Sequence, residues 1–422
     1  MNIFTRARSS HFVRHNSIFF VGAALVGALN YLYYPVMGRL LPTTAFGEVQ
    51  TLISLFLQIT IFLSVLSLVT INVVANYESD AQRNMVVVEF EKLATLISIG
   101  VLVLTLVFER AVTHFFHFAS IGPFLLLMLA LIASVPFTFR GAFLRGKRRF
   151  GLASTANVVS AAAKLLFAVV FVWFGPSTDG AIVGLIAAQL LAWAIAAICA
   201  TRAGLELPAS YRWSRWPNIR LLLPELRYGA LVLVGSLVVT LQYSLDIIVV
   251  KHYFSPHVAG VYAGVASVAR IIFFLTMSIA LVMMSLVRLQ AEPRANRRIL
   301  RYSLLLTTAV GLPLVILSAL DPSRVIDLLM GGAYVASAAL LPKLSLAIFV
   351  VALLNVCVSY YLALRKYAVA PALLVGAALT YGLMYAHHAS LAEIVNNVCI
   401  GSVTMLGIVV IWMYGVRKRE ML

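Results

Sequence analysis

The sequence has few charged residues and very few acidic ones. Asp, Glu, Lys and Arg make up 11% of the 422 residues, and Asp and Glu together number 15. Soluble globular domains carry about a quarter charged residues. Hydrophobic residues make up 62% of the chain and its mean hydropathy is +0.99, which is more apolar surface than a soluble core can bury. The composition therefore excludes a soluble protein and predicts an integral membrane protein.

The chain also lacks the signatures of several classes of enzyme. Its 3 cysteines, Cys199, Cys357 and Cys399, lie apart within apolar segments, so neither a disulfide framework nor a CxxC metal site is indicated. The sequence contains no GxxxxGK[ST] nucleotide-binding loop, no histidines and carboxylates with metal-ligand spacing, and no evident nucleophile and base. We therefore predict no catalytic residue, no metal, no cofactor and no enzymatic activity.

Apolar segments long enough to cross a bilayer as helices recur along the whole chain. They predict an all-α integral membrane fold with about twelve transmembrane helices in two lobes of six around a central cavity. The predicted spans lie near 17–38, 48–74, 88–108, 121–144, 152–174, 180–201, 229–251, 258–287, 302–320, 338–363, 369–387 and 391–415.

The positive charges lie between these apolar segments, and the net charge is +17. This distribution indicates topology signals on membrane loops and argues against nucleic acid as a partner. With both termini on the same side, the loops of that side carry 24 Lys and Arg, whereas the opposite loops carry 4. The positive-inside rule then predicts that both termini are cytoplasmic.

The longest loop divides the chain into two halves. We predict an N-lobe over 1–201, a linker over 202–228 and a C-lobe over 229–422, and the linker is either an amphipathic surface segment or a plain basic connection. A shift of 213 positions aligns Gly47 with Gly260 and Gly22 with Gly235. Six spans followed by six in parallel orientation is a transporter plan with the substrate site between the halves.

Four motifs carry a resemblance to a known family. They are "GRLLPTTAFGEVQTL" (38–52), "FLRGKRRFG" (143–151), "SLDIIVVKHYFSPHVAGVYAGVASVAR" (244–270) and "VIDLLMGGAYVASAALL" (325–341). With these four motifs in this order, the chain resembles the Wzx-like polysaccharide and O-antigen flippases of the multidrug/oligosaccharidyl-lipid/polysaccharide exporter superfamily. The short loops depart from the family pattern and leave the glycan open.

The resemblance implies a function and a location. The protein would move an undecaprenyl-diphosphate-linked oligosaccharide or polysaccharide precursor from the cytoplasmic to the periplasmic leaflet by alternating access. It would be a multi-pass protein of the bacterial plasma (inner) membrane. Its partners would be the lipid-linked glycan, membrane lipids and polysaccharide assembly proteins.

Ionisable residues inside predicted spans are the candidate site residues, because such residues usually face a cavity or a partner. Lys164 lies about ten residues from either end of its span, roughly 15 Å, which is too far for its ammonium group to reach water along the helix. Asn157, Ser160 and Lys164 share one helical face. We predict that Lys164 and Arg270 bind the diphosphate. A buried structural partner for each cation is the alternative.

Other polar residues complete the prediction. Asp246 is interpreted either as half of an ion pair, with Arg39 or Lys251 as candidate partners, or as a residue that carries a coupling proton. The uncharged residues that could line the cavity are Asn30, Gln58, Asn157, Ser160, Tyr243 and Asn355. Each of these could instead form a hydrogen bond between helices.

Two further functions remain open at this point. A cation-coupled drug or metabolite antiporter of the same superfamily would require carboxylates in its cavity, whereas cations outnumber carboxylates deep in these spans. A membrane glycan polymerase or ligase would require a folded periplasmic loop, and the predicted periplasmic loops are short.

Overall fold

The computed structural model describes residues 11–419 apart from 176, 207–215, 288–291 and 367–369, and this part of the chain contains helices and no strand. The helices of the first half are α2 (His11–Leu40), α3 (Thr43–Ile59), α4 (Ile61–Asn76), α5 (Asp80–Val107), α6 (Glu109–Phe116), α7 (Gly122–Gly146), α8 (Phe150–Phe174) and α9 (Thr178–Arg202). Those of the second half are α10 (Ile219–Tyr253), α11 (Pro256–Ala269), α12 (Ile271–Leu286), α13 (Pro293–Leu320), α14 (Pro322–Met330), the 3₁₀ helix η1 (Gly332–Leu340), α15 (Leu341–Ala363), α16 (Ala370–Ala386) and α17 (Leu391–Arg419).

Every predicted span coincides with one helix or with two consecutive helices. Among the described residues, 9 helical segments are long and apolar enough to cross a membrane, and the pair α11–α12, bent by 41°, brings this number to 10. The two remaining predicted spans correspond to α2 and to the shorter apolar helix α16. The all-α membrane fold predicted from composition is therefore confirmed.

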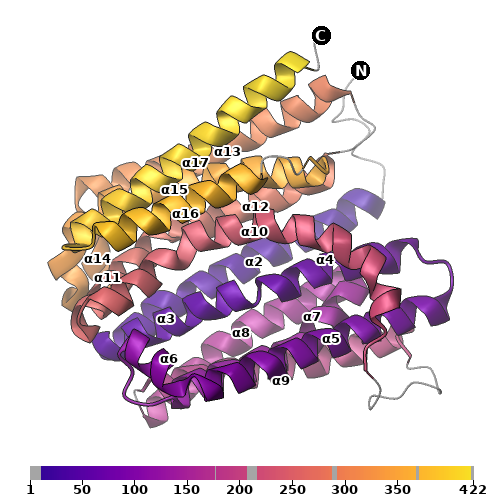
Figure 1. Ribbon diagram of the computed structural model, residues 1–422, viewed down its shortest axis with the longest axis horizontal. Coiled ribbons are helices and arrows are strands. Elements are labelled where there is room, and N and C mark those ends of the chain that lie inside the picture. The colour runs from indigo at the N-terminus through magenta and orange to yellow at the C-terminus, as the bar shows by residue number, and fades with distance from the viewer. Residues whose placement is uncertain (1–10, 176, 207–215, 288–291, 367–369, 420–422) are drawn as a thin grey trace.

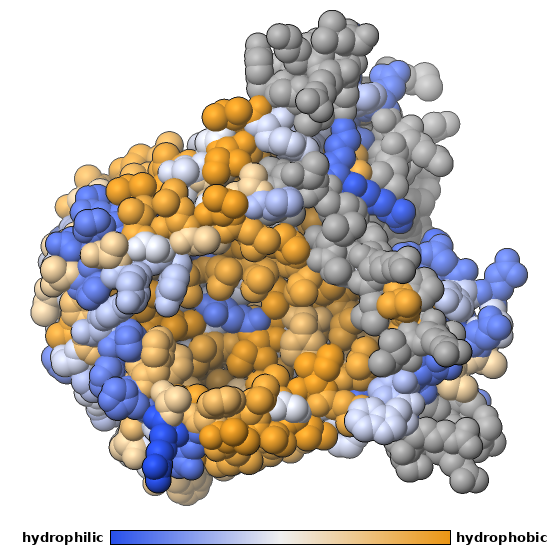
Figure 2. Space-filling view, in the orientation of Figure 1, coloured by the Kyte–Doolittle hydropathy of each residue, from blue (hydrophilic) through white to orange (hydrophobic). Residues whose placement is uncertain are grey.

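The helices form two lobes that meet at one end of the molecule. In Figure 1, α2–α9 make up one lobe and α11–α17 the other, with α10 running between them. The lobes converge where α6, α11 and α14 lie, and they diverge towards the end that carries both termini. On the face seen in Figure 2, apolar residues cover most of the centre and hydrophilic residues lie towards both ends, as expected of a protein surrounded by lipid tails.

The helix boundaries repeat from one lobe to the other. Helices α5 and α13 both contain 28 residues and begin 213 positions apart, at Asp80 and Pro293. The starts of α3 and α11, at Thr43 and Pro256, have the same offset. The internal repeat that the glycine alignment predicts is therefore present in the structure.

The two lobes cross at the aligned glycines themselves. A Cβ atom on Gly47 would lie 2.6 Å from the Cα atom of Gly260, and one on Gly260 would lie 2.0 Å from the carbonyl oxygen of Thr43. No side chain fits at either position without moving the other helix, because real Cβ atoms do not approach backbone atoms so closely. Glycine at these positions allows α3 and α11 to cross in direct backbone contact.

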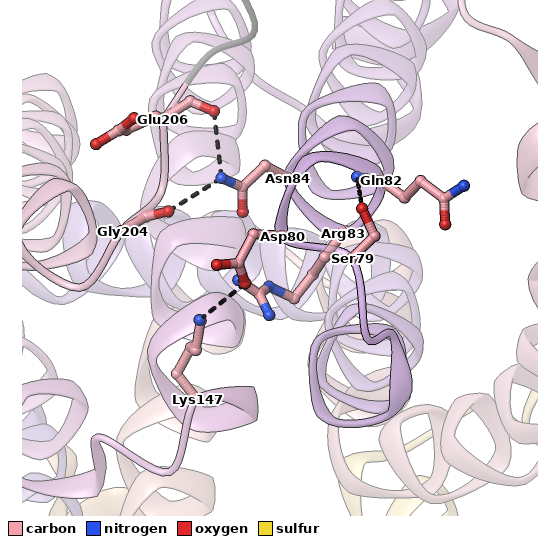
Figure 3. Close-up of polar contacts among 8 residues, drawn as sticks. All are labelled: Ser79, Asp80, Gln82, Arg83, Asn84, Lys147, Gly204 and Glu206. Atoms are coloured by element: carbon pink, nitrogen blue, oxygen red, sulfur yellow. Dashed lines mark hydrogen bonds and ion pairs between the residues drawn. The ribbon is translucent and has the colours of Figure 1, made fainter.

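Both described ends of the predicted linker lie against α5. Asn84 donates hydrogen bonds from Nδ2 to the carbonyl oxygens of Gly204, at 3.0 Å, and Glu206, at 3.3 Å (Figure 3). Glu89 accepts a hydrogen bond through Oε2 from the backbone N–H of Asn218 at 2.9 Å. These bonds tie both ends of the connection to the first lobe. The middle of the predicted linker, 207–215, lies outside the described residues.

Candidate substrate site between the lobes

Lys164 is held by neutral groups. Its ammonium donates a hydrogen bond to Oδ1 of Asn30 on α2 at 2.7 Å and lies 4.6 Å from the centre of the Tyr33 ring. The side-chain amide oxygen and the face of an aromatic ring both attract a cation without cancelling its charge. In the described part of the chain, no carboxylate forms an ion pair with Lys164. The charge of this ammonium is therefore not balanced by an acidic side chain within the described residues.

Arg270 has a different environment, which includes an acid. Its Nη2 donates to Oδ1 of Asp246 at 2.7 Å and its Nε donates to the carbonyl oxygen of Tyr243 at 3.1 Å. The other carboxylate oxygen accepts a hydrogen bond from the hydroxyl of Tyr262 at 2.8 Å. The side chains of Arg270 and Asp246 are only 4% and 3% exposed. The pair is thus a buried ion pair in which both partners are well hydrogen-bonded.

The observed partner of Asp246 differs from the two candidates proposed from the sequence. Asp246 pairs with Arg270, whereas Arg39 donates a hydrogen bond to the carbonyl oxygen of Leu328 and Lys251 lies 3.7 Å from the carboxylate of Glu48. The reason is the helix break at Arg270, where α11 ends and α12 begins. At this break the guanidinium reaches α10, the helix that carries Asp246. A proximity argument along the sequence could not have found a partner 24 positions away.

The two cations are anchored at equivalent positions of the repeat. Asn30 and Tyr33 hold Lys164, while Tyr243 and Asp246 hold Arg270. Positions 30 and 243, like positions 33 and 246, are 213 apart. Each lobe therefore has a cation binding to the same two places on its first helix, α2 or α10.

Aromatic residues connect the two cation sites across the lobe interface. Tyr31 and Tyr34 on α2 contact the ring of Phe274 on α12, with ring centroids 6.4 Å and 5.6 Å apart. Phe274 lies one turn after Arg270, and Tyr31 follows Asn30 directly. The structure thus brings Lys164 and the helix that follows Arg270 to adjacent faces of one short stretch of α2.

The remaining predicted cavity residues are dispersed. Gln58 on α3 donates a hydrogen bond to the hydroxyl of Ser244 on α10 at 3.4 Å, which joins the two lobes. Asn157 and Ser160 are half-buried on α8, and Asn355 is half-buried on α15. Within the described residues, no hydrogen bond connects these three side chains to either cation. Their predicted role as cavity lining stays a prediction.

Sequence reasoning missed a charged contact between the lobes at the end where they converge. Lys251 on α10 is 1% exposed and lies 3.7 Å from Glu48 on α3, and its ammonium is 4.7 Å from the centre of the Phe118 ring. The other oxygen of Glu48 accepts a hydrogen bond from the hydroxyl of Thr178 at 2.6 Å. Both charged residues lie at predicted span ends, where an interfacial position is usual, so the sequence carries no signal of this pairing.

Tyr334 in η1 makes a second contact between the lobes. Its hydroxyl donates a hydrogen bond to the carbonyl oxygen of Gly38 at 3.0 Å, and its ring meets that of Phe46 with centroids 5.7 Å apart. Tyr334 is 1% exposed. Together with Glu48 and Lys251, it closes the end of the molecule that lies opposite the termini.

Residues 13–287 match the family described as polysaccharide biosynthesis protein. The chain belongs to this family. A search of curated proteins gives no match at the sequence level. The family match covers the first lobe from residue 13 onwards, the Arg270–Asp246 pair and all of α11 and α12.

Solved structures of transporters share the fold over nearly the whole chain. The lipid II flippase MurJ in an inward closed conformation matches with a TM-score of 0.72 and 11% identity, covering 95% of this chain and 87% of that one. An inward-facing multidrug resistance MATE transporter of the MOP superfamily matches with a TM-score of 0.70 and 12% identity, covering 94% and 96%. The eukaryotic MATE transporter AtDTX14 matches with a TM-score of 0.66 and 15% identity, covering 97% and 99%. The polysaccharide biosynthesis protein described here is therefore a multi-pass membrane protein with the two-lobed transporter fold.

Proposed function

We propose that this protein is a flippase for an undecaprenyl-diphosphate-linked oligosaccharide or polysaccharide precursor in the bacterial inner membrane. Membership of the polysaccharide biosynthesis family and the transporter fold support the class of protein. The observation that carries the choice of substrate is Lys164, a cation on α8 that lies against α2 and has no carboxylate partner among the described residues. A diphosphate supplies the counter-charge that no acidic side chain among the described residues supplies.

Lys164 is suited to bind a diphosphate. Its ammonium has three donors, of which Asn30 occupies one, so the others can reach phosphate oxygens. In the low dielectric of a membrane protein interior, the attraction between an ammonium and a phosphate is several times stronger than in water. Asn30 and Tyr33 hold the ammonium in place before the substrate arrives.

For Arg270 we infer a positioning role in the conformation observed. Its guanidinium is neutralised by Asp246 and fixes the bend between α11 and α12 against α10. Direct contact between Arg270 and the diphosphate stays a prediction. The assay of glycan transfer described below tests it with the Arg270→Lys variant.

The arrangement of the lobes supports transport by alternating access from one leaflet to the other. The lobes are joined by Glu48–Lys251 and by Tyr334 at the end opposite the termini, and they diverge at the end that carries the termini (Figure 1). The distribution of Lys and Arg favours a cytoplasmic location for the termini. In this assignment the observed state is closed to the periplasm, and the substrate enters from the cytoplasmic leaflet.

The deep carboxylate argues against the export of a cationic drug. A cationic substrate is bound most strongly where a carboxylate is free to pair with it. Asp246 is instead occupied by Arg270 and by the hydroxyl of Tyr262. Lys164, by contrast, has no acid paired with it among the described residues, which favours an anionic substrate.

The proposal is tested by the sidedness of the lipid-linked glycan. Deletion of the gene should cause the undecaprenyl-diphosphate-linked glycan to accumulate in the cytoplasmic leaflet, and the wild-type gene should restore its transfer. The Lys164→Ala variant, present at the wild-type level in the membrane, should fail to restore transfer. Full transfer by this variant would exclude Lys164 as the binding residue, and unchanged glycan sidedness in the deletion strain would exclude the flippase function.

A further inference from the structure

Two arginines adopt the left-handed backbone conformation at equivalent turns of the two lobes. Arg148, after α7, has φ +58°, and Arg365, after α15, has φ +54°. The turns have the same hydrogen bonds: Arg148 and Arg365 donate to the carbonyls three residues earlier, and the next residues, Arg149 and Lys366, to those five residues earlier. In the described chain, His117 is the one other non-glycine residue with a positive φ.

This conformation carries a cost that glycine would avoid. An L-residue in the left-handed region is destabilised by about 1–2 kcal/mol relative to the right-handed region, and helices therefore usually end in glycine at this position. Both lobes instead retain arginine there. Unfavourable backbone conformations cluster at functional sites, so these two positions are candidates for a function of the side chain.

Two general explanations for basic residues do not account for this position. The positive-inside rule requires basic residues in a loop, but it does not require one at the left-handed residue. A cation also stabilises the carboxyl end of a helix, yet Arg145 and Lys147 provide this at right-handed positions of the same turn. A ligand that both turns meet would account for arginine at both positions.

The first turn is arranged so that its charges project outwards. Lys147 forms an ion pair with Asp80 at 3.5 Å, and Asp80 also pairs with Arg83 (Figure 3). The next two residues, Arg148 and Arg149, are exposed. In the second turn Arg365 is likewise exposed. Each turn directly follows an apolar helix, which places its guanidinium group at the level of the lipid headgroups on the side that carries the termini.

We propose that the two turns bind lipid phosphate groups at the membrane surface, one phosphate at each lobe. The guanidinium group fits a phosphate because it donates two parallel hydrogen bonds to its oxygens. A basic side chain close to an anionic membrane surface contributes about a fivefold gain in binding. Two phosphate anchors, one for each lobe, hold the diverging end of the transporter at the headgroup level. This inference does not depend on the proposed transport activity.

The test uses the double variant Arg148→Gly/Arg365→Gly in the full-length protein. Native mass spectrometry from mixed micelles would count the phosphatidylglycerol molecules retained, with phosphatidylcholine as the reference lipid. We expect the retention of phosphatidylglycerol to fall about fivefold or more for each turn. Glycine adopts the left-handed region without steric cost, so the melting temperature should stay the same or rise. A loss of binding can therefore be distinguished from unfolding.

Two further variants and a second lipid complete the test. Arg148→Lys/Arg365→Lys should keep most of the binding. Arg202→Gln/Arg294→Gln, which removes two exposed arginines at other helix ends, should lose less than the glycine variant. Added undecaprenyl diphosphate distinguishes the two sources of the phosphate. A loss confined to this lipid identifies a polyprenyl diphosphate as the ligand, and a loss of phosphatidylglycerol identifies bulk lipid. Unchanged retention of both lipids in the glycine variant, or an equal loss in the glutamine control, would overturn the proposal.

Discussion

The two lobes use equivalent positions to hold a cation, but with different chemistry. In the first lobe, Asn30 and Tyr33 hold Lys164 without neutralising it. In the second, position 246 carries an aspartate in place of the tyrosine at position 33, and Arg270 is neutralised. The acid at position 246, where the first lobe has a tyrosine, thus separates a site whose cation is unpaired among the described residues from a site that stabilises a helix bend. A repeat can keep its architecture while its two sites diverge in function.

The largest loss of stability is expected when Asp246, the acid that neutralises Arg270, is removed. Asp246→Ala leaves the guanidinium of Arg270 buried without a counter-charge, which typically costs about 3–5 kcal/mol. The melting temperature of the purified protein in detergent should fall steeply. By contrast, Lys164→Gln should change it little, since Lys164 has no ionic partner to lose among the described residues.

The double variant Asp246→Leu/Arg270→Met provides the control for this prediction. It removes both charges together and should recover much of the stability, because an apolar pair of similar volume has no desolvation cost. A double variant as unstable as Asp246→Ala would show that the ion pair has a different role.

The second largest effect is expected at Gly260, where α3 and α11 cross in backbone contact. Gly260→Leu would place side-chain atoms against the backbone of Thr43, so the lobes could no longer close there. We expect the distance between spin labels on α3 and α11 to increase by several ångströms in the variant. Gly100→Leu, at a position with no neighbouring atom within 4 Å, is the matched control and should leave the distance unchanged.

A smaller effect is expected at the charged contact between the lobes. Glu48→Gln removes the counter-charge of the buried ammonium of Lys251 and should destabilise the closed state by about 1–3 kcal/mol. Cross-linking between cysteines placed on α3 and α10 would report the loss of closure. Glu393→Gln, at the start of α17, removes a half-buried carboxylate outside this contact and should not alter the cross-linking yield.

The smallest effect is expected for Tyr334→Phe. This variant loses only the hydrogen bond to the carbonyl oxygen of Gly38 and keeps the ring packed against Phe46, so the cost should be about 1 kcal/mol. A fall in melting temperature of a few degrees would agree with this value. A fall as large as that of Asp246→Ala would mean that the hydroxyl has a further partner.

Most of the fold was predictable from the sequence, because a membrane span is a property of a continuous stretch of residues. The apolar length of each segment located the helices, and glycines 47 and 260 indicated the repeat that the helix boundaries confirm. Breaks such as the one at Arg270 were not predicted, because the segment from 258 to 287 is apolar on both sides of the bend.

The site was less predictable, because ion pairs depend on contacts between distant helices. The sequence identified Lys164, Arg270 and Asp246 as unusual, since charge within a span always needs an explanation. It could not tell which of the two cations was neutralised. That distinction depends on where α10 and α12 pack, and on the break that turns Arg270 towards Asp246.

The central claim is that Lys164 is the free cation of the site, and its most direct test is a binding measurement. The dissociation constant for undecaprenyl diphosphate should be determined for the wild-type protein, Lys164→Gln and Lys164→Arg in the same detergent. Loss of a hydrogen-bonded charge contact costs about 1.5–3 kcal/mol, so Lys164→Gln should bind roughly 10- to 100-fold more weakly. Lys164→Arg should retain most of the affinity. Equal affinity of the wild-type protein and Lys164→Gln, at equal melting temperatures, would contradict the account.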